Sequence, residues 1–136
     1  MEYNEITCSD RRLEIVTVDA FEKNPKQFDV ILSISSWEHD GLGRYGDPMN
    51  PNGDLESMEK AKSMLRNGGI LILAVPVGAD ALVWNVHRMY GPIRLPMLLD
   101  GWDVVATYGF DTEHVTTRLG TNAGQPVFVL QPKQPH

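Results

Sequence analysis

The sequence predicts an α/β protein whose sheet is mostly parallel, with one antiparallel strand near the carboxyl end. Two nearly continuous apolar runs, residues 28–34 and 70–75, are typical of parallel strands that are covered on both faces. Apolar side chains recur every three or four residues between these runs, at Leu55, Met58, Ala61 and Leu65. That spacing is typical of an amphipathic helix. The succession of strand, helix and strand predicts a βαβ crossover.

The other elements are expected on both sides of this unit. Residues 15–18 form a β-branched run that ends at Asp19 and predict an earlier strand. Residues 94–99 predict a short helix, interrupted near its start by Pro96. Residues 102–108 and 126–131 predict the last two strands.

The ends of the central helix also have sequence signals. Asn52 or Asp54 is suited to cap its first turn, and Gly68 with Gly69 supplies a left-handed exit. No internal repeat or linker divides the 136 residues, which predict one domain with a real core.

Composition limits the classes of function. Hydrophobic residues make up 42% and charged residues 22% of the chain, as in ordinary soluble proteins. A net charge of −6 argues against a nucleic-acid partner. The single cysteine, Cys8, excludes an intramolecular disulfide and fits a reducing compartment. No apolar run approaches the about 20 residues that cross a bilayer, and the first residues do not resemble a signal peptide. We therefore expect no membrane partner and a cytoplasmic location.

The most informative segment is the loop of seventeen residues from Glu38 to Asp54, EHDGLGRYGDPMNPNGD. Connections of this length inside a compact domain are usually functional or disordered. This loop combines glycines and prolines with aromatic, basic and acidic side chains, which is unlike a disordered linker. Because it follows an apolar strand, it lies where open α/β sheets place their ligand sites.

Three residues of this loop are candidates for chemistry. His39, between Glu38 and Asp40, is placed to act as a general base on a substrate hydroxyl; the alternative is a loop histidine bonded to backbone. Arg44 and Tyr45 lie in the segment bounded by two glycines, and the Arg44 guanidinium is suited to bind a carboxylate or phosphate. The alternative for Arg44 is an ion pair with an aspartate of the same loop.

A second segment, ALVWNVHRMYG, adds further candidates. Asn85, His87 and Arg88 are candidates for contact with a substrate; the alternative is a buried Asn85 or His87 that holds the two long loops together. The two segments also contain oxygen and nitrogen ligands that a divalent metal could use, namely Asp40, Asp47, Asp54, His39 and His87. No compact ligand spacing is present, and loop acids commonly bond to their own turns, so we predict no metal.

The loop EHDGLGRYGDPMNPNGD together with NVHRMYGPIRLPMLLDGW resembles a methyltransferase-like family that is catalogued as a nematode protein family of unknown function. The resemblance covers nearly the whole chain. The succession of strands is similar to the second half of a class I S-adenosylmethionine-dependent methyltransferase, which implies a Rossmann-like three-layer fold.

This resemblance implies roles for particular residues. Glu2 would bind the ribose of S-adenosylmethionine and Asp19 would lie beside the adenine. Ser35 and Ser36, in the segment SISSWE, would lie near the methyl group. One departure is that the chain contains neither the Gly-rich cofactor loop nor the first strand of that fold. The domain is therefore expected to be incomplete at its amino end, through truncation or because a partner strand or a second copy completes the sheet.

The sequence thus predicts a methyltransferase-like protein that acts on a small or glycan-like acceptor. His39 would be the base, and the acceptor would lie against a set of polar and aromatic side chains, namely Arg44, Tyr45, Asn85, His87 and Arg88. Two alternatives remain. The first is a non-catalytic module that keeps the sheet and binds a partner or glycan, and the second is a metal-dependent enzyme that uses the acidic loop.

Overall fold

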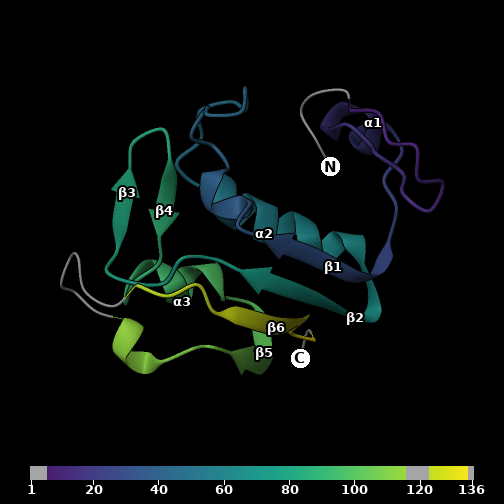
Figure 1. Ribbon diagram of the computed structural model, residues 1–136. Helices are drawn as coiled ribbons and strands as arrows, with labels where there is room; N and C mark the ends of the chain where they lie inside the picture. The colour runs from purple at the N-terminus through teal and green to yellow at the C-terminus, as the bar shows by residue number, and fades with distance from the viewer. Residues whose placement is uncertain (1–5, 116–122, 135–136) are drawn as a thin grey trace.

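The computed structural model describes residues 6–115 and 123–134 (Figure 1). Its helices are α1 (Val18–Lys23), α2 (Gly53–Met64) and α3 (Arg94–Leu98), with 3-10 turns η1 (Trp37–His39) and η2 (Thr112–His114). Its strands are β1 (Phe28–Ile34), β2 (Leu65–Ala74), β3 (Ala81–Val83), β4 (His87–Met89), β5 (Trp102–Tyr108) and β6 (Val127–Pro132). Within this part of the chain no helix is long and apolar enough to cross a bilayer.

The main sheet has the strand order β1-β2-β6-β5. β1 and β2 are parallel and are connected by α2, which confirms the expected βαβ unit. β6 runs antiparallel to both of its neighbours, β2 and β5, and is the antiparallel strand expected near the carboxyl end. The prediction of a mostly parallel sheet was wrong, because β6 inserts between β2 and β5 and makes two of the three strand pairs antiparallel.

One face of this sheet carries the core. Side chains of β2 and β6 that point to this face, such as Leu71, Leu73 and Phe128, pack with Met58 of α2 and Leu98 of α3. Helices α2 and α3 contact each other and share this core. The opposite face of β1 exposes large apolar side chains, at Val30, Leu32 and Ile34. The described residues therefore form a helix layer on one face, and the expected three-layer arrangement is not confirmed.

The strand predicted at residues 15–18 is absent from the described structure. This segment is a loop that leads into α1 at Val18. The Thr17 hydroxyl accepts a hydrogen bond from the Ala20 backbone N–H and caps the helix. Asp19 follows in the first turn, where an acid is favourable to the helix dipole. The capping bond of Thr17 therefore outweighs the preference of the β-branched residues 15–18 for a strand.

Other boundaries differ in smaller ways. α2 ends at Met64, and β2 begins at once with Leu65, so the glycine exit expected at Gly68 lies inside β2. Asn52 occupies the N-cap position of α2 without a side-chain capping bond. Residues 81–89 form a hairpin, β3–β4, that was not expected. Its turn contains Asn85 with a positive φ of 53°, a conformation that asparagine tolerates better than most residues.

Candidate functional site

Asp47 organises the centre of the 38–54 loop. Its carboxylate accepts backbone N–H bonds from Gly41 at 2.6 Å and from Gly43 and Tyr45 at 3.3 Å each. Burial alone would raise the pKa of Asp47, but these N–H donors lower it below its ordinary value. The Asp47 carboxylate therefore stabilises the backbone of the loop through hydrogen bonds.

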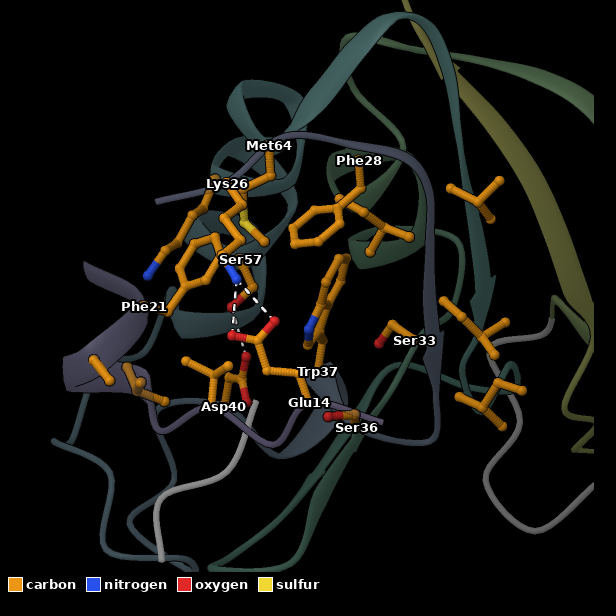
Figure 2. Close-up of a pocket in the computed structure, with 18 of the residues that line it drawn as sticks. Glu14, Phe21, Lys26, Phe28, Ser33, Ser36, Trp37, Asp40, Ser57 and Met64 are labelled. Carbon is orange, nitrogen blue, oxygen red and sulfur yellow. Dashed lines mark hydrogen bonds and ion pairs between the residues drawn. The ribbon is translucent and has the colours of Figure 1, made fainter. Parts of the chain in front are cut away.

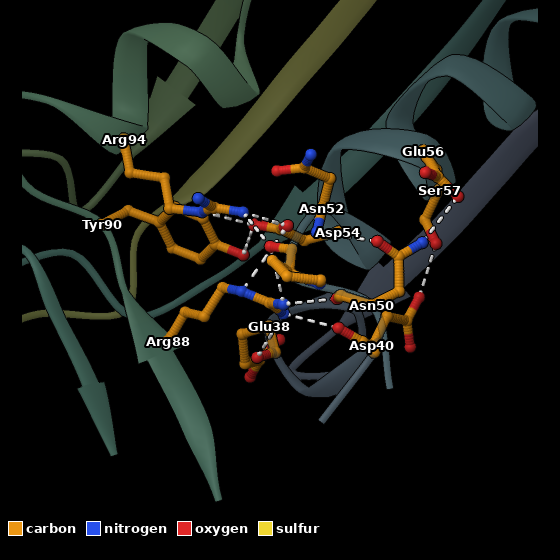
Figure 3. A network of polar contacts seen from close by, with 12 residues as sticks. Glu38, Asp40, Asn50, Asn52, Asp54, Glu56, Ser57, Arg88, Tyr90 and Arg94 are labelled. Carbon is orange, nitrogen blue, oxygen red and sulfur yellow. Dashed lines mark hydrogen bonds and ion pairs between the residues drawn. The ribbon is translucent and has the colours of Figure 1, made fainter. Parts of the chain in front are cut away.

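Asp54 fixes the far end of the same loop, and its fully buried carboxylate is the centre of a polar cluster (Figure 3). Arg94 donates to both of its oxygens, at 2.6 and 2.9 Å, and the Tyr90 hydroxyl donates at 2.9 Å. The Nε atom of Arg88 lies 3.6 Å away. Burial and the Asp54 charge raise the pKa of Tyr90, so its phenol stays protonated.

Arg88 joins the two ends of the loop. Its buried guanidinium donates to four backbone carbonyls, those of Glu38, Asp40, Asn50 and Pro51. All four carbonyls belong to the 38–54 loop, and that of Glu38 lies in η1 at the start of the loop. Arg88, predicted to contact a substrate, is therefore engaged in holding two segments of the loop together, a role that the sequence had offered only for Asn85 or His87.

His39 is held in a defined orientation at the end of η1. Its Nδ1 atom lies 2.5 Å from the carbonyl oxygen of Val86, and because a carbonyl only accepts, Nδ1 carries the proton. In the neutral ring Nε2 is then the acceptor, and it lies 3.7 Å from Oε1 of Glu38. Glu38 is only 1% exposed and accepts a bond of 2.6 Å from the Ser35 hydroxyl. Ser35 has a φ of 48°, which turns the chain sharply out of β1.

Three further predicted residues lie around this imidazole. The Tyr45 ring meets His39 edge-on with centroids 5.6 Å apart, and the His87 ring lies 6.4 Å from His39. The Arg44 guanidinium lies over the Tyr45 ring at 5.7 Å. We call these four side chains, Arg44, Tyr45, His39 and His87, the imidazole cluster. Asn85 is exposed in the hairpin turn that supplies the carbonyl of the neighbouring Val86.

A pocket of about 770 Å³ lies along the free edge of β1, on the other side of η1 (Figure 2). Its apolar wall combines three aromatic side chains, Phe21, Phe28 and Trp37, with aliphatic ones, among them Val30 and Leu32 of β1. Its polar lining includes Ser33, Ser36, Asp40 and Ser57. The Ser33 hydroxyl is buried and has no hydrogen-bond partner in the described part of the chain.

Two acids line this pocket, Asp40 and Glu14, and Glu14 pairs with Lys26. Burial raises the pKa of the Asp40 carboxyl to about 6, against the lowering effect of the Ser57 hydroxyl, which donates to it at 2.5 Å. From the sequence, Asp40 was expected as a metal ligand or as an ion-pair partner of Arg44, and its position in a pocket was not predicted. The described residues hold no cluster of three or more histidine, cysteine or acidic side chains arranged for a metal ion.

The predicted cofactor residues are only partly brought together. Ser36 lines the pocket, whereas the Ser35 hydroxyl is turned to Glu38. Asp19 is exposed on α1, beside Val18 and Ala20, which do line the pocket. Glu2 lies outside the described residues. In the sequence, Trp37 could have indicated the pocket, because it belongs to SISSWE, the segment expected beside the cofactor. Ser57, inside α2, gave no such signal.

Comparison with known proteins identifies the family of the chain. Residues 2–126 match the sequence model of a family described as Caenorhabditis protein of unknown function, DUF268, and the chain belongs to this family. The resemblance to a nematode family of unknown function is thereby confirmed, whereas the methyltransferase relationship stays a prediction. No curated protein matches the chain.

Proposed function

We propose that this member of the DUF268 family is methyltransferase-like and transfers a methyl group to a hydroxyl of a small or glycan-like acceptor. The observation that carries the proposal is the position of η1 between two different sites. Trp37 and Asp40 line the pocket beside β1, while His39 belongs to the imidazole cluster and points toward Tyr45. One short turn thus separates a cavity suited to a cofactor from side chains suited to an acceptor.

The size and lining of the pocket support S-adenosylmethionine as its ligand. Pockets of about 300–1,000 Å³ hold ligands of this size. Aromatic side chains suit the purine ring, and the unpartnered Ser33 hydroxyl and the Asp40 carboxylate suit its polar groups. When bound, this cofactor supplies a methyl group on a sulfonium. We also propose that part of this structure is the far half of a Rossmann-like fold. This part consists of the parallel strands β1 and β2, the helix α2 between them and the antiparallel strand β6.

His39 would accept the proton of the acceptor hydroxyl. Its Nδ1–H bond to the Val86 carbonyl keeps Nε2 available in the neutral ring. The buried Glu38 carboxylate, 3.7 Å from Nε2, would stabilise the imidazolium that results. The Ser35 hydroxyl holds that carboxylate in place.

The test is a titration with S-adenosylhomocysteine, followed by tryptophan fluorescence and calorimetry. The chain has three tryptophans, of which Trp37 lines the pocket, Trp84 is exposed on the hairpin and Trp102 is buried in the core. We expect the ligand to change the emission of the wild-type protein and of Trp84→Phe, but not of Trp37→Phe. No heat and no emission change at millimolar ligand would overturn the cofactor part of the proposal.

A non-catalytic binding module is the second candidate. It is favoured by the imidazole cluster, whose side chains all come from residues 39–87 and lie against one another. If the wild-type protein and His39→Gln bind an acceptor equally well and neither binds S-adenosylhomocysteine, the binding module is the correct description. Methyl transfer by the wild-type protein that falls at least about 100-fold in His39→Gln would support the enzyme.

A further inference from the structure

Arg44 is a cation without an ionic partner in the described part of the chain. The sequence left open an ion pair with an aspartate of its own loop. The two aspartates nearest to it in that loop are occupied, because Asp47 accepts three backbone N–H bonds and Asp40 accepts the Ser57 hydroxyl. The Arg44 side chain is exposed and lies over the Tyr45 ring. Bracing of the loop therefore does not account for its charge.

The surroundings of Arg44 suit a ligand with both a charge and a hydroxyl-bearing ring. The Tyr45 side chain is 52% exposed and offers an aromatic surface to the C–H groups of such a ring. The imidazoles of His39 and His87 follow directly beyond it. Glu38, which lies 3.7 Å from Nε2 of His39, is buried and bonded to Ser35, so it does not present a repelling charge at the surface.

The local charge contrasts with that of the whole chain. The protein carries a net charge of −6, counted with neutral histidines, yet the imidazole cluster presents the exposed Arg44 guanidinium beside two partly buried imidazoles. A guanidinium fork binds carboxylate and phosphate oxygens through charge-assisted hydrogen bonds. A local cationic site on an acidic protein selects anions and disfavours neutral analogues.

We infer that the imidazole cluster binds an anionic sugar, with Arg44 on the carboxylate or phosphate, Tyr45 beneath the ring and a ring hydroxyl near Nε2 of His39. This inference deepens the proposed function, because it names the acceptor class of the same site. It assigns Arg44 the role of selecting charged over neutral sugars. The binding itself does not require a cofactor.

The experiment compares D-glucuronate, glucose 6-phosphate and D-glucose by amide NMR titration, without added cofactor. We expect at least one of the anions to shift the Gly43, Tyr45 and Gly46 amides and to bind roughly tenfold or more tightly than glucose, as charge-assisted bonds predict. A preference for glucuronate alone assigns a carboxylate, and a preference for the phosphate alone assigns a phosphate. Equal affinity for all three sugars, or no binding, would overturn the inference.

Two variants assign the selectivity to Arg44. Arg44→Gln should lose the preference for anions while its spectrum stays folded. Arg66→Gln removes the same charge from an exposed arginine of β2 that pairs with Asp29, and should keep the preference. An Arg44→Gln protein as selective as the wild type would overturn the inference. A chain that binds sugar anions but not S-adenosylhomocysteine would keep this inference and lose the proposed enzyme, and the reverse result would do the opposite.

Discussion

At the residue scale, the chain contains two Asp–Arg pairs of equal length and very different surroundings. Asp54 and Arg94 approach to 2.6 Å with the carboxylate 0% exposed, and Asp29 and Arg66 approach to 2.6 Å with the carboxylate 77% exposed. Removing Asp54 takes away the carboxylate acceptor of the Arg94 guanidinium and the Tyr90 phenol, and the counter-charge beside the buried Arg88. The same chemical pair should therefore have unequal energetic weight.

We expect Asp54→Ala to lower the free energy of unfolding by about 3–5 kcal/mol. Asp29→Ala should lower it by about 1 kcal/mol or less. Urea denaturation of both variants measures the difference. Similar losses for the two variants would mean that burial does not govern the strength of these pairs.

The ionisation of Asp40 should appear in the pH dependence of stability. Burial raises the pKa of this carboxyl from 3.8 to about 6 in the folded protein. The folded state therefore holds the proton more tightly than the unfolded state, and ionisation destabilises the fold. This penalty is absent below about pH 3.8, grows up to about pH 6 and is constant above it.

Asp40→Asn removes that penalty. Its stability relative to the wild type should rise between about pH 4 and pH 6 and then level off, by about 1–2 kcal/mol after allowance for partial solvent screening. Ser57→Ala should lose more stability than the wild type over this pH range, because the Ser57 hydroxyl lowers the pKa of Asp40. Urea midpoints across this range measure both effects, and a flat difference for Asp40→Asn would contradict the assignment.

At the element scale, the 38–54 loop depends on two glycines with similar backbone angles. Gly41 has a φ of 78° and Gly46 a φ of 86°. A Cβ atom on Gly41 would overlap the Asn50 carbonyl, whereas a Cβ on Gly46 would meet nothing within 4 Å. The Gly41 carbonyl also accepts the Asn50 N–H at 2.8 Å, so the two sides of the loop touch there.

Alanine at the two positions separates backbone strain from collision. Gly46→Ala should lower the free energy of unfolding by only about 1–2 kcal/mol, the strain of a left-handed residue. Gly41→Ala adds the collision and should both lower stability further and shift the amide signals of His39 and Tyr45. Equal effects of the two substitutions on stability and spectra would show that the loop adapts to the added methyl.

The sequence predicted the elements whose periodicity is strong and failed where tertiary neighbours decide. α2, α3 and β5 were found close to their actual bounds, and β6 within one residue at each end. The run at 15–18 looks like a strand, but Thr17 uses its hydroxyl to cap α1. The hairpin at 81–89 has a weak signal, because its strands are three residues long and its turn depends on the conformation of Asn85.

The candidate site was predicted to a similar extent. The loop residues His39, Arg44 and Tyr45 were expected together because they are near in sequence. The approach of His87 depends on the hairpin, whose Val86 carbonyl accepts the His39 Nδ1–H. Asp40, Asp47 and Asp54 look alike in the sequence, and only the fold determines which one pairs, which one binds backbone and which one faces a pocket.

At the scale of the whole molecule, the sheet has one covered and one uncovered side. β1 is an edge strand of the described sheet and exposes large apolar side chains, at Val30, Leu32 and Ile34. Exposed apolar edges promote pairing with other chains. The sequence-based expectation of a partner strand or a second copy is a prediction that this surface makes testable.

We expect the protein to associate as its concentration rises, through the exposed side of β1. Leu32→Lys places a charge in the middle of that strip, where Leu32 is 62% exposed, and should reduce association without lowering the urea midpoint. Ile93→Lys alters an equally exposed aliphatic residue, at 71%, that precedes α3 and lies outside the sheet, so it should leave association unchanged. Sedimentation equilibrium of the three proteins measures their mass. Dissociation by Ile93→Lys alone would move the contact to the helical side of the molecule, because only a residue within the contact should be sensitive to an added charge.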